Sequence, residues 1–514
     1  MSKTLIYREY LIVILAGIII YFSFAPYNFY FLGFISIILL LRSVENSTFI
    51  SAAMRTYLYG LSLYGVGCLH IYTMLNNFVH NTYIASMMYF ALVAFLATYP
   101  CLKICIYKCY KGSYLQKALM FSSIWIVVDW ARERIFTGFP YLNLGYSLVD
   151  TKLAALSPII SVYGLSWIII FISSLMYFAY SNYKNERHIP LLITTLVGVV
   201  IISSIFASNI KWTHRDGTKE DLILVQGNMP IKDYWNPQTY QDKISIYENL
   251  TQHQWKNKTI IWPENSITLP SNYGRDILNK WDNHAKHHNS TLILGIPKSV
   301  ASVELLRKNY FYNQVIAIGA GKGYYYKNKL VPWAEYIPWG NLGQFIAAKI
   351  NIPEANMFSD ASDQATFNVL SSKNINWVPF ICYEFYFPSY VINRAQNGNV
   401  LLNIVNDGWF GNTNGLFINL QIAQMRALET GRPVVRVANN GITAVISPDG
   451  KVVQQLPPFT RGILNTTIFG YQGFTPIMYF GTEWLILLSL VMILLMFLLS
   501  VRSNRRQLLI DQYA

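Results

Sequence analysis

Blocks of apolar residues about 20 residues long recur through the first 210 residues, and one more lies near the C-terminus. A helix of that length crosses the hydrocarbon core of a bilayer. With 53% hydrophobic and 13% charged residues, the chain is too apolar for an ordinary soluble protein. The sequence therefore predicts a polytopic α-helical membrane domain of about eight spans. We place the spans near 10–27, 29–42, 56–76, 82–102, 117–131, 154–180, 189–208 and 479–501.

Lys and Arg gather on alternate connections between these spans, and this bias orients a membrane protein. The segments that carry them are the N-terminus, 42–55, 103–117, 184–187 and 502–514. Loops 25–29 and 77–81 carry none, whereas the connection near 132–153 has three against the pattern. We expect both termini in the cytoplasm and residues 209–478 in the periplasm. Topology explains much of the net charge of +14, so no nucleic-acid partner is implied; the surplus suits an anionic membrane surface.

These boundaries predict four parts. Residues 1–208 hold spans one to seven with a periplasmic connection near 132–153, 209–478 form an outer domain, 479–501 form span eight and 502–514 a cytoplasmic tail. In the outer domain, short runs of Ile, Leu and Val alternate with helical patterns, which favours an α/β or α+β sandwich. Predicted elements are strands at 221–228, 259–264, 291–297, 377–384 and 399–407, a hairpin over 313–330, a helix over 419–431 and two strands across 433–453.

One cysteine of the five lies in the outer domain, Cys382 in FICYEF. An isolated thiol in an oxidising compartment has no disulfide partner, so chemistry at the thiol is the strongest reason for it. Glu264 in WPENS and Lys327 in YYYKNKL also stand at or just past strand ends. A carboxylate can take the proton of a thiol, and an ammonium can lower the thiol pKa and stabilise an oxyanion. Taken separately, the three also fit a buried small hydrophobe, a helix cap and a solvated lysine.

The motifs WPE, KNKLVPWAEYIP, ICYEFYFP and NDGWFG, in that order, resemble the nitrilase-type carbon–nitrogen hydrolases. VQGNMP (225–230), LVPWAEYIP (330–338) and QIAQMRALETGRPVVRVANNGITAV (421–445) resemble one membrane-bound branch, the apolipoprotein N-acyltransferases. The membrane half resembles that branch in FSFAPY (22–27) and TGFPYLNLGYS (137–147). The resemblance covers nearly the whole chain and implies a nitrilase-like αββα sandwich for the outer domain.

The resemblance also assigns residues. Glu264 falls on the family's general base, Lys327 on its catalytic lysine and Cys382 on its nucleophile. Further matches, for which packing remains the alternative explanation, are the supporting residues Glu335, Tyr383 and Glu384 and the substrate-binding Trp235. Glu335 would orient Lys327 or hold the attacking amine, and the N–H of Tyr383 would be a second oxyanion donor.

The activity implied is a two-step acyl transfer in the bacterial inner membrane, with the catalytic domain on the periplasmic side. Cys382 would take a fatty acyl chain from a membrane phospholipid and pass it to the α-amino group of the S-diacylglyceryl cysteine of an apolipoprotein. No metal or organic cofactor is implied, and a monomer is expected. Two alternatives stay open: a membrane-bound nitrilase-type amidase or hydrolase, and a catalytically inactive lipid-binding or transport protein on the same scaffold. Eight spans argue against the first, and the filled triad against the second.

Two further observations concern contact with the bilayer and charges within the predicted spans. Residues 415–419 depart from the family's pattern, and their apolar run 416–418 could equally dip into lipid. No predicted span carries several buried charges, and Asp129 at the end of the fifth is the main candidate for one.

Overall fold

The chain forms two compact units in the computed structural model, which describes residues 3–181, 189–231, 234–300, 310–350, 358 and 370–513. The first unit is Met1–Leu69 with Ser86–Ile210 and Phe480–Ala514. The second is His70–Ala85 with Lys211–Tyr479. The division near residue 210 lies close to the expected one, but a short piece from the predicted third span belongs with the outer domain.

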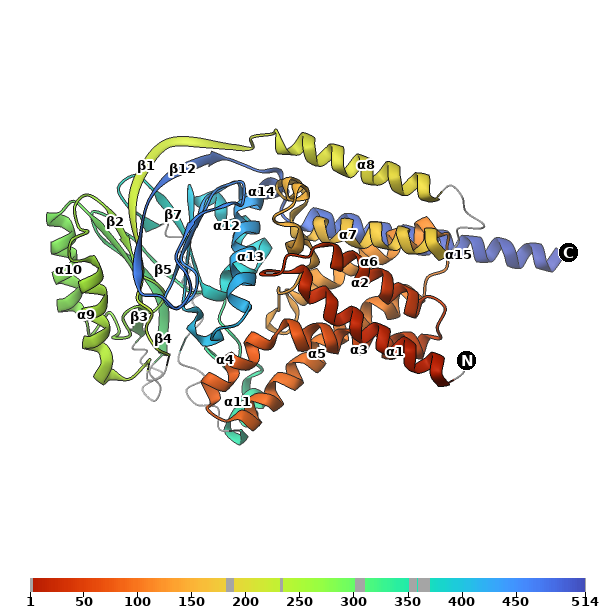
Figure 1. The fold of residues 1–514 in the computed structure, drawn as a ribbon, viewed down its shortest axis with the longest axis horizontal. Coiled ribbons are helices and arrows are strands. Elements are labelled where there is room, and N and C mark those ends of the chain that lie inside the picture. The colour runs from red at the N-terminus through yellow and green to blue at the C-terminus, as the bar shows by residue number, and fades with distance from the viewer. Residues whose placement is uncertain are drawn as a thin grey trace. The chain divides into compact units, whose positions relative to one another are not determined.

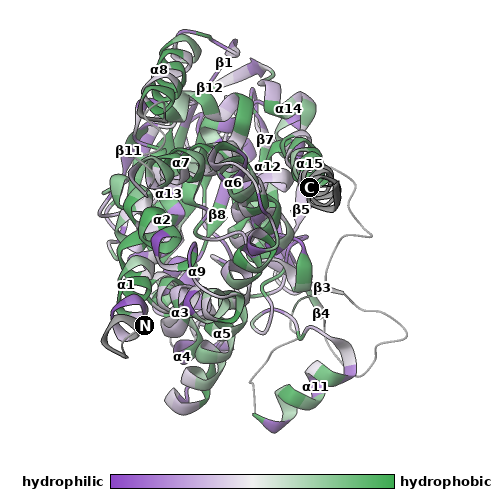
Figure 2. Cartoon of the chain, turned by 90° about the vertical axis from the view of Figure 1, so that its right-hand side faces the viewer, coloured by the Kyte–Doolittle hydropathy of each residue, from purple (hydrophilic) through white to green (hydrophobic). Residues whose placement is uncertain are grey.

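The first unit is built from helices whose residues are mainly apolar, as Figure 2 shows by colour. The α-helices are α1 Lys3–Ile19, α2 Phe31–Val44, α3 Phe49–Gly67, α5 Thr82–Lys108, α6 Tyr114–Arg132, α7 Ser157–Ser181, α8 Ile189–Ser208 and α15 Glu483–Tyr513. Single 3₁₀ turns are η1 Ile20–Ser23, η2 Ile135–Thr137, η3 Leu144–Leu148 and η4 Lys152–Leu156. Each predicted span is therefore helical, and the predicted tail continues α15.

Within the described residues, four helices are long and apolar enough to cross a membrane: Thr82–Lys108, Lys152–Ser181, Leu191–Ser208 and Glu483–Ser500. A fifth arises if α3 and α4 (Leu69–Val79) count together, and α2 is a shorter apolar helix. Apolar helices of this number and length are typical of a membrane protein.

The predicted third span, 56–76, is a broken helix rather than a straight one. α3 ends at Gly67 and α4 leaves it at 61°. A side chain at Gly67 would place Cβ 2.5 Å from Leu142 Cδ1, so the leucine side chain packs directly against the glycine. α4 belongs to the second unit, where Asn77 Nδ2 donates to the Trp409 carbonyl oxygen at 3.2 Å. The break escapes a hydropathy reading because the apolar run continues through it.

Charged side chains are buried together in the first unit around Asp129, the candidate named from the sequence, and α6 carries a second buried charge, Arg132, where no span was expected to carry several. Lys103 Nζ of α5 lies 2.7 Å from Asp129 Oδ1 of α6, and Arg132 Nη2 lies 3.5 Å from the same oxygen. Arg132 Nη2 also donates to Asn143 Oδ1 at 2.6 Å. Pairing offsets the cost of burying each charge. Lys103 reads as part of a basic loop in the sequence, but α5 extends past it to Lys108.

The second unit contains two six-stranded sheets. The first, in the order β12-β1-β2-β3-β4-β5, comprises β1 Thr213–Gln226, β2 Thr259–Ile261, β3 Thr291–Val300, β4 Tyr310–Gly319, β5 Tyr324–Tyr326 and β12 Gly462–Gly473. The second, in the order β11-β10-β9-β8-β7-β6, comprises β6 Leu370–Ser371, β7 Asn376–Ile381, β8 Val400–Val405, β9 Val434–Ala438, β10 Ala444–Ile446 and β11 Val452–Gln455. β1–β2–β3 and β7–β8–β9 pair in parallel, and the other neighbours pair antiparallel.

Helices cover the outer faces of both sheets, with α9 and α10 beside the first and α12 and α13 beside the second (Figure 1). The helices of this unit are α4, α9 Tyr240–Thr251, α10 Arg275–His287, α11 Gly340–Lys349, α12 Pro388–Arg394, α13 Gly415–Thr430 and α14 Pro476–Phe480. Its 3₁₀ turns are η5 Pro237–Thr239, η8 Cys382–Tyr386, η9 Ala395–Asn397 and η10 Asp407–Phe410.

Alternation along β1 shows how the layers pack. Leu222 and Leu224 enter the core between the two sheets, where they join Leu402 of β8. Ile223 joins the core under the outer helices with Tyr247 of α9. Successive residues of a strand point to opposite faces, so one strand serves both cores. The predicted αββα sandwich is confirmed, although β12 was not assigned from its sequence.

The predicted helix over 419–431 begins earlier, at Gly415, and its C-cap Gly431 has φ of +58°, as glycine-terminated helices do. Leu416 and Ile418 are fully buried on this helix. The alternative that they dip into lipid was therefore wrong for these two residues, because the first turn of α13 covers the protein's own core.

Candidate active site

The ends of several strands bring the candidate residues together. Lys327 directly follows β5, and Cys382 directly follows β7. Glu264 lies three residues past the end of β2, and Asn406 directly follows β8. Strand ends that meet at one edge are where α/β folds place reactive groups, since turns there can differ without disturbing the sheets.

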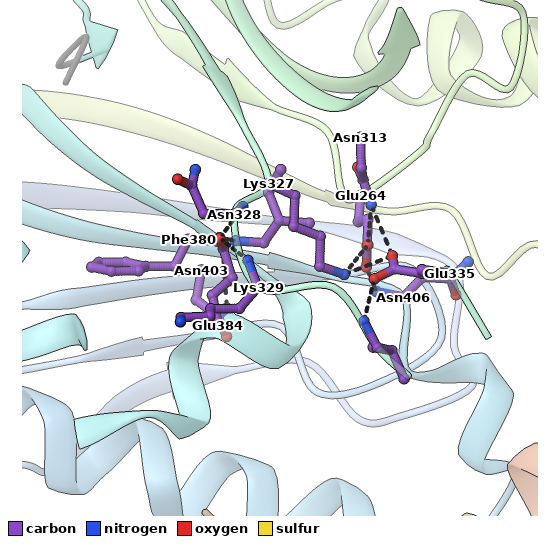
Figure 3. Close-up of polar contacts among 12 residues, drawn as sticks. Glu264, Asn313, Lys327, Asn328, Lys329, Glu335, Phe380, Glu384, Asn403 and Asn406 are labelled. Atoms are coloured by element: carbon purple, nitrogen blue, oxygen red, sulfur yellow. Dashed lines mark hydrogen bonds and ion pairs between the residues drawn. The ribbon is translucent and has the colours of Figure 1, made fainter. Parts of the chain in front are cut away.

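Lys327 lies between two carboxylates, as Figure 3 shows. Its Nζ is 2.7 Å from Glu335 Oε1 and 3.6 Å from Glu264 Oε1, and its side chain is 1% exposed. Burial alone lowers the pKa of Lys327, but Glu335 and Glu264 outweigh burial and raise the pKa well above its usual value. The side chain is therefore an ammonium at neutral pH, a fixed positive charge in a dry site.

Glu264 accepts hydrogen bonds on both oxygens. Asn313 Nδ2 donates to Oε1 at 2.8 Å, and the Asn406 main-chain N–H donates to Oε2 at 2.9 Å. Burial raises the pKa of Glu264 above the usual value, and Lys327 partly opposes that rise. The raised pKa gives this carboxylate a higher proton affinity, and its two hydrogen bonds keep it oriented. Both properties suit a general base that first takes a proton and later returns it.

Glu335 orients the lysine through a short loop. Its Oε1 accepts from Lys327 Nζ, and its Oε2 accepts from the Val331 main-chain N–H at 2.7 Å. The Glu335 N–H in turn donates to the Val331 carbonyl oxygen at 2.9 Å. These contacts fit the first of the two roles expected for Glu335, because the carboxylate is held by its own loop and by the ammonium.

Cys382 directly follows β7 as the first residue of η8, and its backbone is strained. Its φ is +50°, a region that costs a residue with a side chain about 1–2 kcal/mol. Burial raises the pKa of the thiol well above its usual value, Glu264 raises it further, and Lys327 lowers it. The resting group is a neutral thiol, so it needs a base before it can attack. Strain of this kind at a residue aimed into a site is typical of function.

Glu384 joins the lysine segment to the cysteine turn (Figure 3). Its Oε1 accepts from the main-chain N–H groups of Asn328 at 2.6 Å and Lys329 at 3.1 Å, and its Oε2 accepts from the Ile381 N–H at 2.7 Å. The Tyr325 hydroxyl donates to Oε1 at 2.6 Å. Since these donors flank Lys327 and Cys382, one fully buried carboxylate sets the spacing of both.

The other two predicted residues lie as follows. The Tyr383 ring packs edge-on against Tyr386 and Phe387, with centroids 5.6 and 5.0 Å apart, and its main-chain N–H follows Cys382 directly. Trp235 is half-buried beside the core under the outer helices, and its ring centroid lies 5.8 Å from that of Phe358.

The sequence reading missed two residues that hold the base. Asn313 bonds Glu264 and also contacts Glu335 Oε1 at 3.4 Å, while the Asn406 N–H bonds Glu264. Asn406 begins the motif NDGWFG, so a signal for it existed. Asn313 begins a predicted hairpin strand and had no such signal, since its role depends on which strands become neighbours.

Two family matches together cover most of the chain. Residues 16–175 match the apolipoprotein N-acyltransferase N-terminal domain, and residues 224–469 match carbon-nitrogen hydrolase. The apolipoprotein N-acyltransferase of Photobacterium profundum is 32% identical over 505 residues, which are 94% of this chain and 95% of the relative. The chain belongs to the apolipoprotein N-acyltransferase family. A second relative of that name, from Coxiella burnetii, is 31% identical over 94% of this chain and 99% of its own.

Membership of the apolipoprotein N-acyltransferase family makes the chain a membrane-bound acyltransferase with a nitrilase-like domain. Among solved structures, a carbon-nitrogen hydrolase from Helicobacter pylori aligns with 49% of this chain and 89% of its own, at 13% identity and a TM-score of 0.36.

Proposed function

We propose that this chain transfers a fatty acyl chain from a membrane phospholipid to the α-amino group of the S-diacylglyceryl cysteine of apolipoproteins, through a thioester on Cys382. Family membership supports the reaction class. The observation that carries the residue assignment is the pairing of a neutral thiol on a strained turn with a buried lysine ammonium and a buried carboxylate of raised pKa. Glu264, Lys327 and Cys382 are the catalytic residues of this proposal.

In the first half-reaction, Glu264 takes the proton of the thiol while the sulfur attacks the ester carbonyl carbon of the phospholipid. The carbonyl π-bond becomes an oxyanion, which the Lys327 ammonium and the Tyr383 N–H stabilise. One such donor contributes roughly 10²- to 10³-fold in rate. The oxyanion then collapses, the ester C–O bond breaks, and the lysophospholipid oxygen leaves with the proton held by Glu264.

In the second half-reaction, the α-amino nitrogen attacks the thioester carbonyl and Glu264 takes a proton from that nitrogen. The C–S bond breaks, the acyl chain stays on the nitrogen as an amide, and the sulfur regains its proton from Glu264. Atoms and charges balance over the two steps without any further reactant.

A membrane setting suits both substrates. Exposing an acyl chain to water costs about 0.8 kcal/mol per CH₂, so chemistry at the bilayer surface avoids extracting the chains. We place the enzyme in the bacterial inner membrane as a monomer, with the catalytic domain on the periplasmic side, which the Lys and Arg bias supports. Trp235, which is half-buried and lies near Phe358, would contact the lipid substrate.

Mass spectrometry of the purified protein in phospholipid vesicles tests the proposal. We expect the peptide containing Cys382 to gain the mass of one fatty acyl chain, which a diacylglyceryl-cysteine peptide then discharges. Cys382→Ala abolishes the adduct, whereas the matched control Cys109→Ser, which removes an exposed thiol, keeps it. Discharge by water as fast as by the peptide would contradict the transferase and favour a hydrolase.

A further inference from the structure

The turn after β8 holds a buried ion pair that the proposed reaction does not use. Arg436 Nη2 donates to Asp407 Oδ2 at 2.6 Å, and each side chain is 1% exposed. Desolvating two charges is costly, and an apolar pair of similar volume is often at least as stable. The position of this pair therefore points to a role other than stabilising the domain.

Arg436 lies on β9, the strand beside β8, and its side chain reaches the turn after β8. It lies on β9 opposite Asn403 of β8 and also donates to Asn403 Oδ1. Asn403 Nδ2 donates in turn to the Phe380 carbonyl oxygen of β7 at 3.4 Å, a contact drawn in Figure 3. The Arg436 guanidinium is thus held by Asn403 of β8, and on the turn it bonds Asp407.

Asp407 directly follows Asn406, whose N–H donates to Glu264 Oε2 at 2.9 Å. The Asp407 carboxylate packs closely against Gly441, because a Cβ at Gly441 would lie only 2.1 Å from Asp407 Oδ2. A second side chain, Asn419 of α13, approaches the other oxygen at 3.5 Å. The carboxylate is therefore held on three sides, and the backbone one residue before it faces the base.

We propose that Arg436 and Asp407 are positioning residues of the active site, whose ion pair holds the turn after β8 so that the Asn406 N–H meets the Glu264 carboxylate. The inference rests on the proposed role of Glu264 as general base. It assigns the ion pair no contact with substrate.

Losing the hydrogen bond from the Asn406 N–H should change the pH at which Glu264 ionises. An N–H donor stabilises the ionised carboxylate, so its loss raises the pKa of Glu264, which burial has already raised. The groups that act on Glu264 or respond to it are Lys327, Glu335, Cys382 and Tyr234. Asp407 also raises the pKa of Cys382, so loss of its charge lowers the thiol pKa, whereas loss of the N–H donor raises the pKa of Glu264. The acidic limb of the pH–rate profile should therefore move to higher pH.

The test is a double variant, Arg436→Met/Asp407→Asn. Arg436→Met alone leaves Asp407 buried without its partner and can unfold the domain. The double variant removes one positive and one negative charge, so the net charge beside the site is unchanged. A rise of the midpoint reports the turn, because the direct effect of losing Asp407 is to lower the pKa of Cys382. We expect the acidic midpoint of thioester formation on Cys382 to rise by about one pH unit, which is a tenfold loss of rate below the midpoint.

A matched control exists in α13, where Arg426 Nη1 lies 3.0 Å from Glu429 Oε2 and both side chains are fully buried. Arg426→Met/Glu429→Gln removes the same kinds of group, and we expect it to keep the wild-type midpoint. Equal midpoints in both double variants and the wild type would overturn the inference. So would a loss of rate by the same factor at every pH, since that is what a structural role alone produces.

A second readout separates this inference from the proposed function. Alkylation of Cys382 by iodoacetamide, followed on its own peptide by mass spectrometry, needs neither phospholipid nor lipoprotein. An alkylation profile shifted to higher pH, opposite to the direct effect of losing Asp407 on the thiol, in a protein that never forms the acyl thioester would support the inference and contradict the function. A profile that stays in place or moves to lower pH, in a protein that forms the thioester, would do the reverse.

Discussion

Glu384→Gln is the most informative substitution outside the triad. The carboxylate accepts from three main-chain N–H groups, those of Asn328, Lys329 and Ile381, and from the Tyr325 hydroxyl. Glutamine has the same shape, but one of its two terminal atoms is an amide nitrogen that cannot accept. At least one buried N–H therefore loses its acceptor whichever way the amide is turned.

The size of the effect follows from those contacts. A buried donor left without a partner costs about 1–3 kcal/mol, and the remaining bonds weaken because the acceptor is neutral. Burial raises the pKa of Glu384, so the uncharged amide recovers part of the cost of desolvation. We expect a net loss of about 1–3 kcal/mol. The donors lie next to Lys327 and Cys382 in the chain. The same loss of free energy therefore makes the reactive arrangement of these two residues harder to reach, and it slows the thioester step roughly 5- to 150-fold.

The assay is the initial rate of acyl-thioester formation on Cys382, measured with the thermal unfolding midpoint of each variant. Two tyrosines provide graded controls, since Tyr325 donates to Glu384 at 2.6 Å and Tyr390 at 3.4 Å. We expect Glu384→Gln to be slowest, Tyr325→Phe intermediate and Tyr390→Phe close to wild type. A folded Glu384→Gln protein with the wild-type rate would refute the reasoning, and so would equal losses in the two tyrosine variants.

Three further outcomes are expected. Lys327→Met should slow thioester formation by roughly 10²- to 10³-fold, because it removes an oxyanion donor; a loss below tenfold would argue against that role. Because the folded-state pKa of Glu264 is raised, this carboxyl lowers stability as pH rises above about 4.3. The thermal unfolding midpoint of wild type minus that of Glu264→Gln should therefore fall as the pH rises above about 4.3, and a rise of this difference would contradict the sign. Cys382→Gly should unfold no lower than Cys382→Ala, since glycine accepts φ of +50° without strain; calorimetry showing the opposite would remove strain from the account.

Sequence patterns predicted the outer domain well where a local signal existed. β7 and β8 are short apolar runs that end in polar residues, and Gly431 marks the end of α13. The same approach failed where hydropathy was continuous through a change of structure. The break after Gly67 lies within an apolar run, so it becomes visible only in the folded helices, where α4 leaves α3 at 61°.

The triad was identified from motifs, but the arrangement around it was not. Periodicity places Glu264, Lys327 and Cys382 each near a strand end, and the family resemblance gives them roles. It could not show that Glu384 bonds the N–H groups of the two residues after Lys327, since such groups belong to nearly every residue and carry no side-chain signal. Likewise Asn313 and Arg436 look like ordinary strand residues until their neighbours are known.

The sequence by itself determined the class of the protein: its apolar segments, its alternating strands and the residue types of the thiol, carboxylate and lysine that we propose as the catalytic groups. These depend on residue type and on spacing along the chain, which the sequence contains. Only the tertiary structure decided the electrostatics of the thiol. Burial and the nearby carboxylates hold the pKa of Cys382 high while Lys327 opposes them. That balance depends on distances in space between groups from separate strands, because Coulomb interactions and desolvation act through space and not along the sequence.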